Sequence, residues 1–272
     1  MSLLKAREHL VGCHATGPEW LPGVGVIQRR SDTMLIEVIV QTLEDAREAL
    51  RGGADRLEVV RSIRDGGLTP PLSLVRAIAD ETGLPLRVMV RENNGFGTSA
   101  AELPALRRAA WAFADQGVDG LVIGFAANGQ PDIRAVEEVL EGAPHASFTF
   151  HRAFDALADP MSAIDAIAKI RGVDRILTSG GTGVPALRSL RIREFGERAG
   201  DRLVIVAGGN VDLPTFISMA RSGWVREMHL GRMARLPEDP DAPVWGDKVQ
   251  MLRELAASLA PARQGALPFE IP

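Results

Sequence analysis

Residues 147–178 read SFTFHRAFDALADPMSAIDAIAKIRGVDRILT, and this stretch decides the fold class. Its first five residues alternate polar with apolar side chains, which is typical of a strand. Asp159 and Pro160 then supply a cap and a first-turn residue for a helix that runs to residue 171. The turn Gly172-Val173-Asp174 ends this helix and starts a second strand. The stretch therefore predicts one complete strand–helix–strand unit.

The same alternation recurs along the chain from Met34 onward. Short runs rich in Val, Ile and Leu predict eight strands, at 34–40, 55–60, 86–91, 119–124, 147–152, 174–178, 202–207 and 225–230. Amphipathic segments predict eight helices, near 42–51, 71–82, 100–116, 132–141, 160–171, 184–198, 213–222 and 247–259. Ser99 and Glu102 predict a capping box for the third of these helices.

Eight such units in roughly 230 residues predict an α/β protein with a single (β/α)8 TIM barrel. An open doubly wound sheet is the alternative, but Gln41-Thr42-Leu43 follows the first strand in place of a glycine-rich turn. The barrel domain is expected at 34–260. Residues 1–33 are expected to be an extension, because glycine and proline interrupt any period there, and Met34 is an alternative start. Residues 261–272 are expected to be a tail.

Composition excludes several classes of protein. The chain has 272 residues, of which 46% are hydrophobic and 24% charged, and this is average for a soluble globular protein. A net charge of −4 gives no basic excess for nucleic acid. The longest apolar runs are strand-sized, so we expect no membrane span. The N-terminus makes a poor signal peptide, so we expect a cytoplasmic location. The single cysteine, Cys13, excludes an intrachain disulfide and a multi-cysteine metal site.

The alternation of side chains along each strand assigns one face to the barrel interior. The polar residues on that face are Glu37, Glu58, Arg87, Arg91, Thr149, His151, Glu227 and His229. A barrel that needed only stability would carry Val, Ile and Leu there. Buried charges are costly unless they are paired. The set therefore indicates either a structural salt-bridge network or a polar site at the carboxyl ends of the strands.

Glycine and serine gather after the predicted sixth, seventh and eighth strands. The candidate anion-binding residues in these loops are Ser179, Gly180, Gly208, Gly209, Gly231 and Arg232. Loops after the last two strands are the usual phosphate site of such barrels, where backbone N–H groups approach the anion. Tight turns that merely need glycine are the alternative interpretation.

Several stretches resemble the CutC-type copper homeostasis family: GGADRLEVV (52–60), DGGLTPPLSLV (65–75), FTFHRAFD (148–155), RILTSGG (175–181), IVAGGNV (205–211) and REMHLGRMAR (226–235). The resemblance spans about Met34 to Leu259 and implies a TIM barrel, a cytoplasmic location and a link to copper tolerance. The positions that match the family pattern are Glu37, Glu58, Arg91, His151, Arg152, Asp155, Thr178, Ser179, Gly180, Gly208, Gly209, Glu227 and His229.

The chain also departs from that family. Cysteine often follows the glutamates of the first two strands in the family, and here those positions hold Val38, Ile39, Val59 and Val60. The family's Ile-Arg-Pro-Arg-Gly-Gly is Val-Arg-Glu-Asn-Asn-Gly at 90–95. Cu(I) prefers thiolate and thioether ligands. The metal ligands that remain are His151, His229 and Glu227, a set that suits Zn, Mn or Fe(II) better than Cu(I).

Two functions compete. The resemblance implies copper handling, with a metal ion as the partner and copper as the bound group. The interior residues favour an isomerase or lyase that acts on a small anionic or phosphorylated metabolite, with a divalent metal or none. The catalytic candidates are Glu37 or Glu58 as base, His151 or His229 as acid, Arg91 as the anion holder, and Asp155. A non-catalytic scaffold is a third class without a positive signal, and a homo-oligomer is compatible with the sequence.

Overall fold

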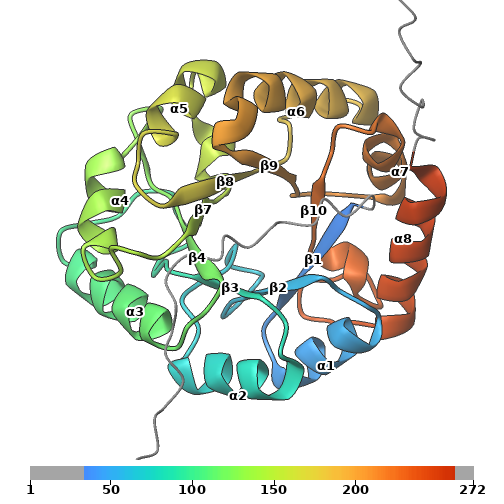
Figure 1. Cartoon of the computed structure of the whole chain (residues 1–272), viewed down its shortest axis with the longest axis horizontal. Coiled ribbons are helices and arrows are strands. Elements are labelled where there is room, and N and C mark those ends of the chain that lie inside the picture. The colour runs from blue at the N-terminus through green and yellow to red at the C-terminus, as the bar shows by residue number, and fades with distance from the viewer. Residues whose placement is uncertain (1–33, 261–272) are drawn as a thin grey trace, which may run out of the picture. The chain divides into compact units, whose positions relative to one another are not determined.

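Eight parallel strands close into a barrel in the order β1-β10-β9-β8-β7-β4-β3-β2 (Figure 1). The structure is a computed structural model that describes residues 34–260, so the predicted extension and tail lie outside the described residues. The barrel strands are β1 (Leu35–Val40), β2 (Arg56–Val59), β3 (Leu86–Met89), β4 (Gly120–Ile123), β7 (Phe148–Phe150), β8 (Val173–Thr178), β9 (Val204–Ala207) and β10 (Glu227–Leu230). The predicted TIM barrel is confirmed.

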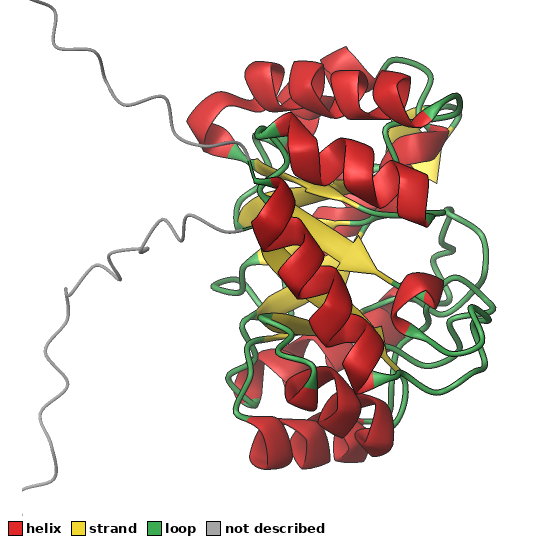
Figure 2. Ribbon diagram, turned by 90° about the vertical axis from the view of Figure 1, so that its right-hand side faces the viewer, coloured by secondary structure: helices red, strands yellow, loops and turns green. Residues whose placement is uncertain are grey.

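A helix follows each barrel strand and packs on the outside of the barrel (Figure 2). These helices are α1 (Leu43–Arg51), α2 (Leu72–Thr82), α3 (Leu103–Asp115), α4 (Ile133–Leu140), α5 (Pro160–Ile167), α6 (Pro185–Ala199), α7 (Leu213–Ser222) and α8 (Gly246–Leu259). The remaining elements are a hairpin of β5 (Ala126–Ala127) and β6 (Gln130–Pro131) and the 3-10 turns η1 (Arg152–Ala156), η2 (Gly200–Arg202) and η3 (Arg232–Ala234). In the described part of the chain, none of the helices combines the length and the apolar run that crossing a membrane requires.

The helix caps mostly follow the predicted residues. The carboxylate of Asp159 accepts hydrogen bonds from the amides of Met161 and Ser162, and Asp212 caps α7 in the same way. The predicted capping box at Ser99 is wrong. The Glu102 carboxylate does accept from the Ser99 amide at 2.9 Å, but the Ser99 hydroxyl donates to the same carboxylate, and α3 begins only at Leu103. These four residues form a turn ahead of the helix.

The apolar residues separate into two clusters, as the predicted alternation requires. Outward-facing strand residues such as Val38, Leu57 and Phe148 belong to the large core between the barrel and its helices. A small separate cluster of Ile39, Val60, Met89 and Val122 lies on the other face of the strands, inside the barrel. The interior face therefore holds a small apolar cluster as well as charged residues.

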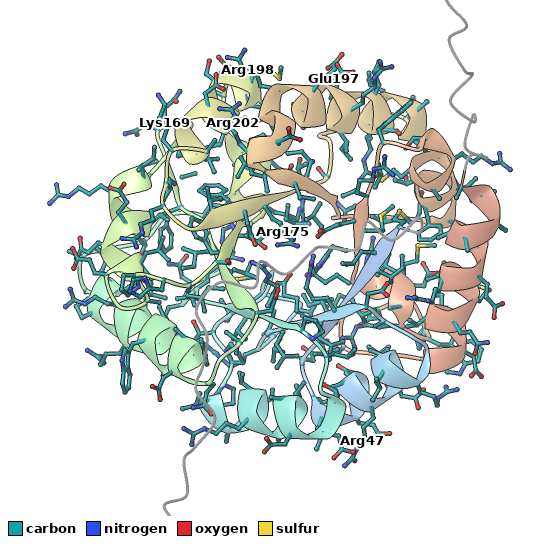
Figure 3. The ribbon with its side chains drawn as sticks, in the orientation of Figure 1. Arg47, Lys169, Arg175, Glu197, Arg198 and Arg202 are labelled. Atoms are coloured by element: carbon teal, nitrogen blue, oxygen red, sulfur yellow. The ribbon has the colours of Figure 1, made fainter. Side chains whose placement is uncertain are left out.

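The layer nearest the amino ends of the strands is an ionic network. Arg56 of β2 donates to Glu37 of β1 and to Glu227 of β10, both at 2.5 Å. Arg175 of β8 donates to Glu227 at 2.9 and 3.1 Å. All four side chains are buried, and Figure 3 shows Arg175 inside the ring of strands. The opposite charges offset the cost of burial, so these residues form the structural network that the sequence left open.

Arg87 of β3 belongs to this structural layer as well. Its guanidinium contacts Asp119 at 2.7 Å and Asp174 at 2.7 Å. Asp119 and Asp174 lie at the start of β4 and in the first part of β8. Arg87 therefore lies inside the barrel, as predicted, but far from the carboxyl ends of the strands.

Candidate functional site

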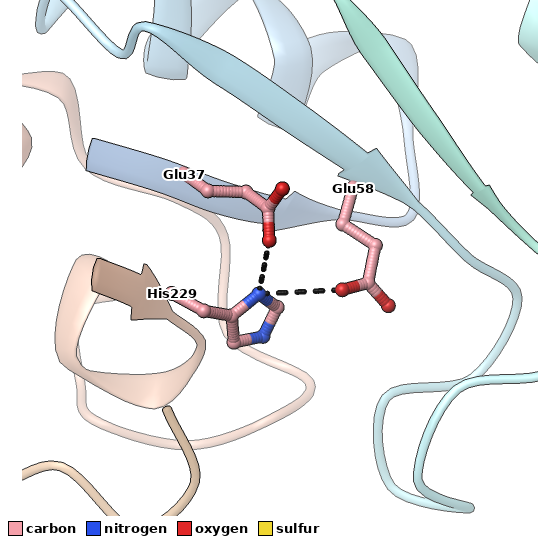
Figure 4. A group of neighbouring side chains, drawn as sticks. All are labelled: Glu37, Glu58 and His229. Carbon is pink, nitrogen blue, oxygen red and sulfur yellow. Dashed lines mark hydrogen bonds and ion pairs between the residues drawn. The ribbon is translucent and has the colours of Figure 1, made fainter. Parts of the chain in front are cut away.

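Two glutamates and a histidine meet inside the barrel at the carboxyl-terminal side of the ionic network (Figure 4). Nδ1 of His229 lies 2.8 Å from the Glu37 carboxylate and 3.3 Å from the Glu58 carboxylate. The register of β1 places Glu37 beside His229 on β10, and places Ile39 beside Glu58 on β2. At least 93% of each residue's surface is buried, so water screens these charges weakly.

Glu37 stays ionised in this cluster. Burial acts to raise its pKa, but Arg56 and His229 outweigh burial and hold the pKa well below its usual range. The ionised carboxylate can only accept hydrogen bonds. Nδ1 of His229 therefore carries a proton and donates a hydrogen bond to Glu37. Glu37 thereby fixes the orientation of the His229 ring.

Glu58 and His229 are neighbouring titratable groups, and each affects the pKa of the other. Burial, reinforced by the charge of Glu37, raises the pKa of Glu58 to about 7. Burial disfavours a charged His229, but Glu58 and Glu37 outweigh it and raise the pKa of the imidazole. A carboxyl group with a pKa near 7 next to a histidine with a raised pKa can take up and release protons at physiological pH.

His151 lies across the barrel from this pair, directly after β7. Its Nδ1 accepts a hydrogen bond from the Ala153 amide at 3.0 Å. Nε2 therefore carries the ring proton, and this buried N–H has no hydrogen-bond partner among the described residues. Burial first, then the charges of Arg91 and Arg152, lower the pKa of His151 to about 3. His151 is therefore neutral at physiological pH, and the catalytic role predicted for it would use the N–H of the neutral ring.

Two arginines supply positive charge at the carboxyl end of the barrel. Arg91, after β3, donates to the carbonyls of Gly66 at 2.8 Å and Gly95 at 3.1 Å. Arg152, in η1, donates through Nε to Asp155 at 3.0 Å, and its side chain remains 40% exposed. Burial first, and the charge of Arg152 in addition, lower the pKa of Arg91 and of His151, and both oppose the charged form of His229. The positive charge of Arg152 therefore acts on all three groups.

Asp155 has a positioning role. Its carboxylate accepts hydrogen bonds from the Thr178 hydroxyl at 2.6 Å and from the Ser179 amide at 3.1 Å, besides the one from Arg152. These donors fill its acceptor sites. Asp155 therefore braces η1 against the loop after β8, and the catalytic role predicted for it stays a prediction.

The glycine-rich loops are only partly free to bind an anion. The Ser179 amide is held by Asp155, the Gly180 amide by the Thr178 hydroxyl, and the Gly208 amide by the Thr178 carbonyl. These three amides are already occupied, which corrects the anion-binding role predicted for them. Gly231 comes directly after β10, and the neighbouring Arg232 is exposed at the start of η3.

Gly209 is the loop residue that touches the charged site. Its φ is +87°, and a Cβ at this position would lie 2.5 Å from Nε of Arg152. Only glycine allows the guanidinium to pack so closely against this backbone. The Gly209 and Asn210 carbonyls point the other way, toward the buried guanidinium of Arg188 at 2.7 and 3.1 Å.

The predicted metal ligands do not come together. Of His151, His229 and Glu227, only His229 belongs to the described group of side chains close enough to share an ion, with Glu37 and Glu58. Glu227 is held by the two arginines of the ionic network, and Nδ1 of His151 is occupied by a backbone amide. The ion pairs of Glu227 and the hydrogen bond to Nδ1 of His151 therefore keep these two residues from sharing an ion with His229.

The sequence assigned no role to two arginines that shape the site, although Arg152 is among the positions that match the family pattern. Arg152 is part of the FTFHRAFD stretch, and its position next to an inward-facing histidine was the available signal. Arg188 lies on α6 and is 7% exposed, and it also donates to the Ser179 carbonyl at 2.8 Å. No pattern marks Arg188, because its role depends on loops that follow two different strands.

Comparison with known proteins identifies the family. The family model described as the CutC family matches residues 34–234. This chain belongs to the CutC family. It is 36% identical over 210 residues to the family protein CutC of Mesorhizobium japonicum, covering 75% of this chain and 79% of that protein. It is also 36% identical over 198 residues to the family protein CutC of Caulobacter vibrioides, covering 72% and 80%.

A solved structure shares the fold. The crystal structure of the putative copper homeostasis protein CutC from Streptococcus agalactiae superposes with a TM-score of 0.67 at 24% identity, covering 72% of this chain and 97% of that one. The matched residues 34–234 contain Glu37, Glu58, His151 and His229. The family match therefore covers the whole candidate site.

Proposed function

We propose that this CutC family chain is an enzyme of the isomerase or lyase type, which moves a proton on a small anionic metabolite at the carboxyl end of its barrel. The observation that carries the proposal is the contact between Glu58 and Nδ1 of His229. Glu37 accepts a hydrogen bond from the same ring nitrogen. A barrel built for stability alone has no need of this arrangement, because apolar residues fill the interior at a lower cost.

Glu58 is the base in this proposal. One of its oxygens faces His229, and the other has no hydrogen-bond partner among the described residues. A buried carboxylate whose pKa is about 7 is a strong enough base to take a proton from a carbon acid, and about half of it is ionised at neutral pH. His229, anchored through Nδ1, is left with Nε2 to donate or receive the second proton.

Arg91 and Arg152 hold the anion. Arg91 uses Nε and Nη1 on backbone carbonyls, and Nη2 has no partner among the described residues. Arg152 uses only Nε among the described residues, which leaves both of its terminal nitrogens available there. Guanidinium groups bind carboxylate and phosphate through paired, charge-assisted hydrogen bonds. The small anionic metabolite and the cytoplasmic location remain predictions.

Copper handling fits the donor set poorly. The cluster of Glu37, Glu58 and His229 offers two carboxylates and one imidazole, without sulfur, whereas Cu(I) prefers soft ligands. The Nδ1 atom that faces both carboxylates carries a proton, and Arg56 already holds Glu37. A metal ion would have to displace both. We therefore assign this cluster to proton transfer.

The test is proton exchange on carbon. The full-length chain is incubated in D2O with pyruvate, 2-oxoglutarate, dihydroxyacetone phosphate or ribulose 5-phosphate, and 1H NMR follows the C–H signals next to the carbonyl. We expect exchange on at least one compound, a loss of about 100-fold or more in Glu58→Gln, and no loss in the presence of a metal chelator. Glu44→Gln, an exposed change on α1, is the control. Absence of exchange on every compound, or full exchange in Glu58→Gln, contradicts the proposal.

A further inference from the structure

The unpartnered N–H of His151 is the least explained polar group at the site. Among buried side-chain nitrogen and oxygen atoms of the described residues, Nε2 of His151 is one of three without a hydrogen-bond partner. A buried donor left unpaired costs about 1–3 kcal/mol. Such a cost persists at functional sites where a ligand supplies the missing partner.

The direction of this N–H follows from the backbone. Phe148 and Phe150 face the helices, so the alternation carries His151 to the barrel interior. Nδ1, the ring nitrogen nearer the main chain, is fixed by the Ala153 amide. Nε2 is at the opposite side of the ring from this amide, and it is buried.

Two neighbours pack closely against the ring of His151. A Cβ on Gly124, at the end of β4, would lie 2.8 Å from Nδ1 of His151, so glycine is required there. On another side the ring of Phe96 packs at 5.8 Å between centroids, and Phe96 in turn lies under the Arg91 guanidinium at 5.3 Å. His151 is therefore held on two sides, and burial, together with the charge of Arg91, keeps its imidazole neutral.

We propose that His151 is a catalytic residue that donates its Nε2–H to the carbonyl oxygen of the substrate, which makes the substrate a small anion with a ketone or aldehyde next to the reacting carbon. This inference rests on the proposed function. Glu58 takes the proton from that carbon, the C–H electron pair forms a carbon–carbon double bond, and the carbonyl π pair moves onto the oxygen. The oxygen becomes negative and is stabilised by the His151 N–H, which keeps its own proton.

A neutral donor suits this step better than a charged one. In this proposal Arg91 and Arg152 bind the permanent negative charge of the substrate. The neutral His151 N–H stabilises the negative charge that develops on the carbonyl oxygen during the reaction. A hydroxyl oxygen can also accept from this N–H, but its own hydrogen then needs an acceptor inside the buried site, whereas a carbonyl oxygen brings no donor. The site therefore favours ketones over the corresponding alcohols.

The experiment compares ligands that differ only at the carbonyl. Calorimetry measures binding of dihydroxyacetone phosphate against glycerol 3-phosphate, and of pyruvate against lactate, to the full-length chain. We expect the ketone of at least one pair to bind about tenfold more tightly than its alcohol. Equal affinity within both pairs, or no binding by any of the four, overturns the inference.

Two substitutions of His151 separate the roles of its ring nitrogens. His151→Asn places an acceptor near Nδ1 but removes the far donor, so the ketone preference should disappear while alcohol binding persists. His151→Gln places an N–H near Nε2, so part of the preference should return. A preference that survives in His151→Asn overturns the inference. If that loss is seen while Glu58→Gln still exchanges carbon protons, the proposed role of Glu58 fails and the His151 donor stands.

A measurement on the unmodified chain guards against a folding defect in the variants. Two-bond 1H–15N NMR reports which ring nitrogen of His151 carries the proton. We expect the Nε2–H form between pH 5 and 8, given Arg91 and Arg152 as the charged groups that face the ring. A ring protonated on Nδ1, or on both nitrogens, in this range overturns the inference.

Discussion

Nδ1 of His229 donates to Glu37 over 2.8 Å and lies 3.3 Å from Glu58, so one imidazole joins an ionised carboxylate to a carboxyl group that titrates near neutral pH. The three groups come from β10, β1 and β2, which are neighbours in the closed sheet. Their protonation states are consequently linked, and each can be tested through the others.

Glu37→Gln should lower the pKa of His229. The variant removes a negative charge and an accepting carboxylate from Nδ1, and an opposite charge at this distance shifts a pKa by about 1–3. The measurement is an NMR titration of the His229 ring. The exposed variant Glu44→Gln on α1 is the control and should leave the titration unchanged. An unaltered His229 pKa in Glu37→Gln would contradict the contact described here.

Arg175→Met should destabilise the barrel by about 3 kcal/mol. The change leaves Glu227 buried with Arg56 alone, and breaking a buried ion pair on one side is strongly destabilising. Urea denaturation measures the effect as the free energy of unfolding. Arg47→Met on α1 is the matched control, because the same change there removes an exposed arginine and should have no measurable effect (Figure 3). Equal stabilities of the two variants would contradict a structural role for the network.

The barrel could be predicted from the sequence because the alternation of side chains along a strand depends only on residues that are neighbours in the chain. The alternation along each strand placed Glu37, Glu58, His151 and His229 on the interior face, and the structure has all of them there. Another local pattern, the capping box at Ser99 and Glu102, failed. Glu102 accepts hydrogen bonds from Ser99 and from Asn93 ahead of the helix instead.

The layer that each interior residue occupies could not be predicted. Glu227 and His229 lie two residues apart on β10, yet Glu227 joins the ionic network and His229 joins the proton-transfer pair. That division depends on which arginines the neighbouring strands place at the same height. The role of Arg152 was missed for a similar reason, because it depends on the close approach of Gly209 from another loop.

Acid should destabilise this protein partly through His151. The unfolded chain binds a proton at this residue near pH 6.5, whereas the folded chain resists protonation down to about pH 3. The free energy of unfolding therefore falls as the pH drops below about 6.5, and at pH 5 this residue accounts for about 2 kcal/mol. His229 has the opposite sign, because its raised pKa adds stability at low pH that is lost as the pH rises.

The contribution of His151 is isolated by comparing variants. Denaturation of the wild type and of His151→Gln at pH 7.5 and pH 5 should show that the wild type loses about 2 kcal/mol more between the two conditions. His145→Gln, which removes an exposed histidine, is the control. Parallel losses in the wild type and His151→Gln would show that His151 is not buried in its neutral form.

Gly209→Ala should weaken anion binding about tenfold. A Cβ at this position would displace the Arg152 guanidinium, and the positive φ adds backbone strain. Gly83→Ala is a close match, because Gly83 also has a positive φ but has open space around it. Calorimetry with inorganic phosphate measures the effect. Equal phosphate affinity in the two variants would separate Arg152 from the anion site.

Cu(I) should not bind at the glutamate–histidine cluster. The available atoms are carboxylate oxygens and an imidazole nitrogen that is protonated toward Glu37, and Cu(I) prefers sulfur ligands. Burial closes the cluster further, because a cation that enters must also displace the Arg56 contact to Glu37. A competition titration under reducing conditions, with a chromophoric chelator and without phosphate, is expected to give only the chelator background. Stoichiometric Cu(I) binding that disappears in His229→Ala would assign the cluster to copper and would remove the basis for proton transfer by Glu58.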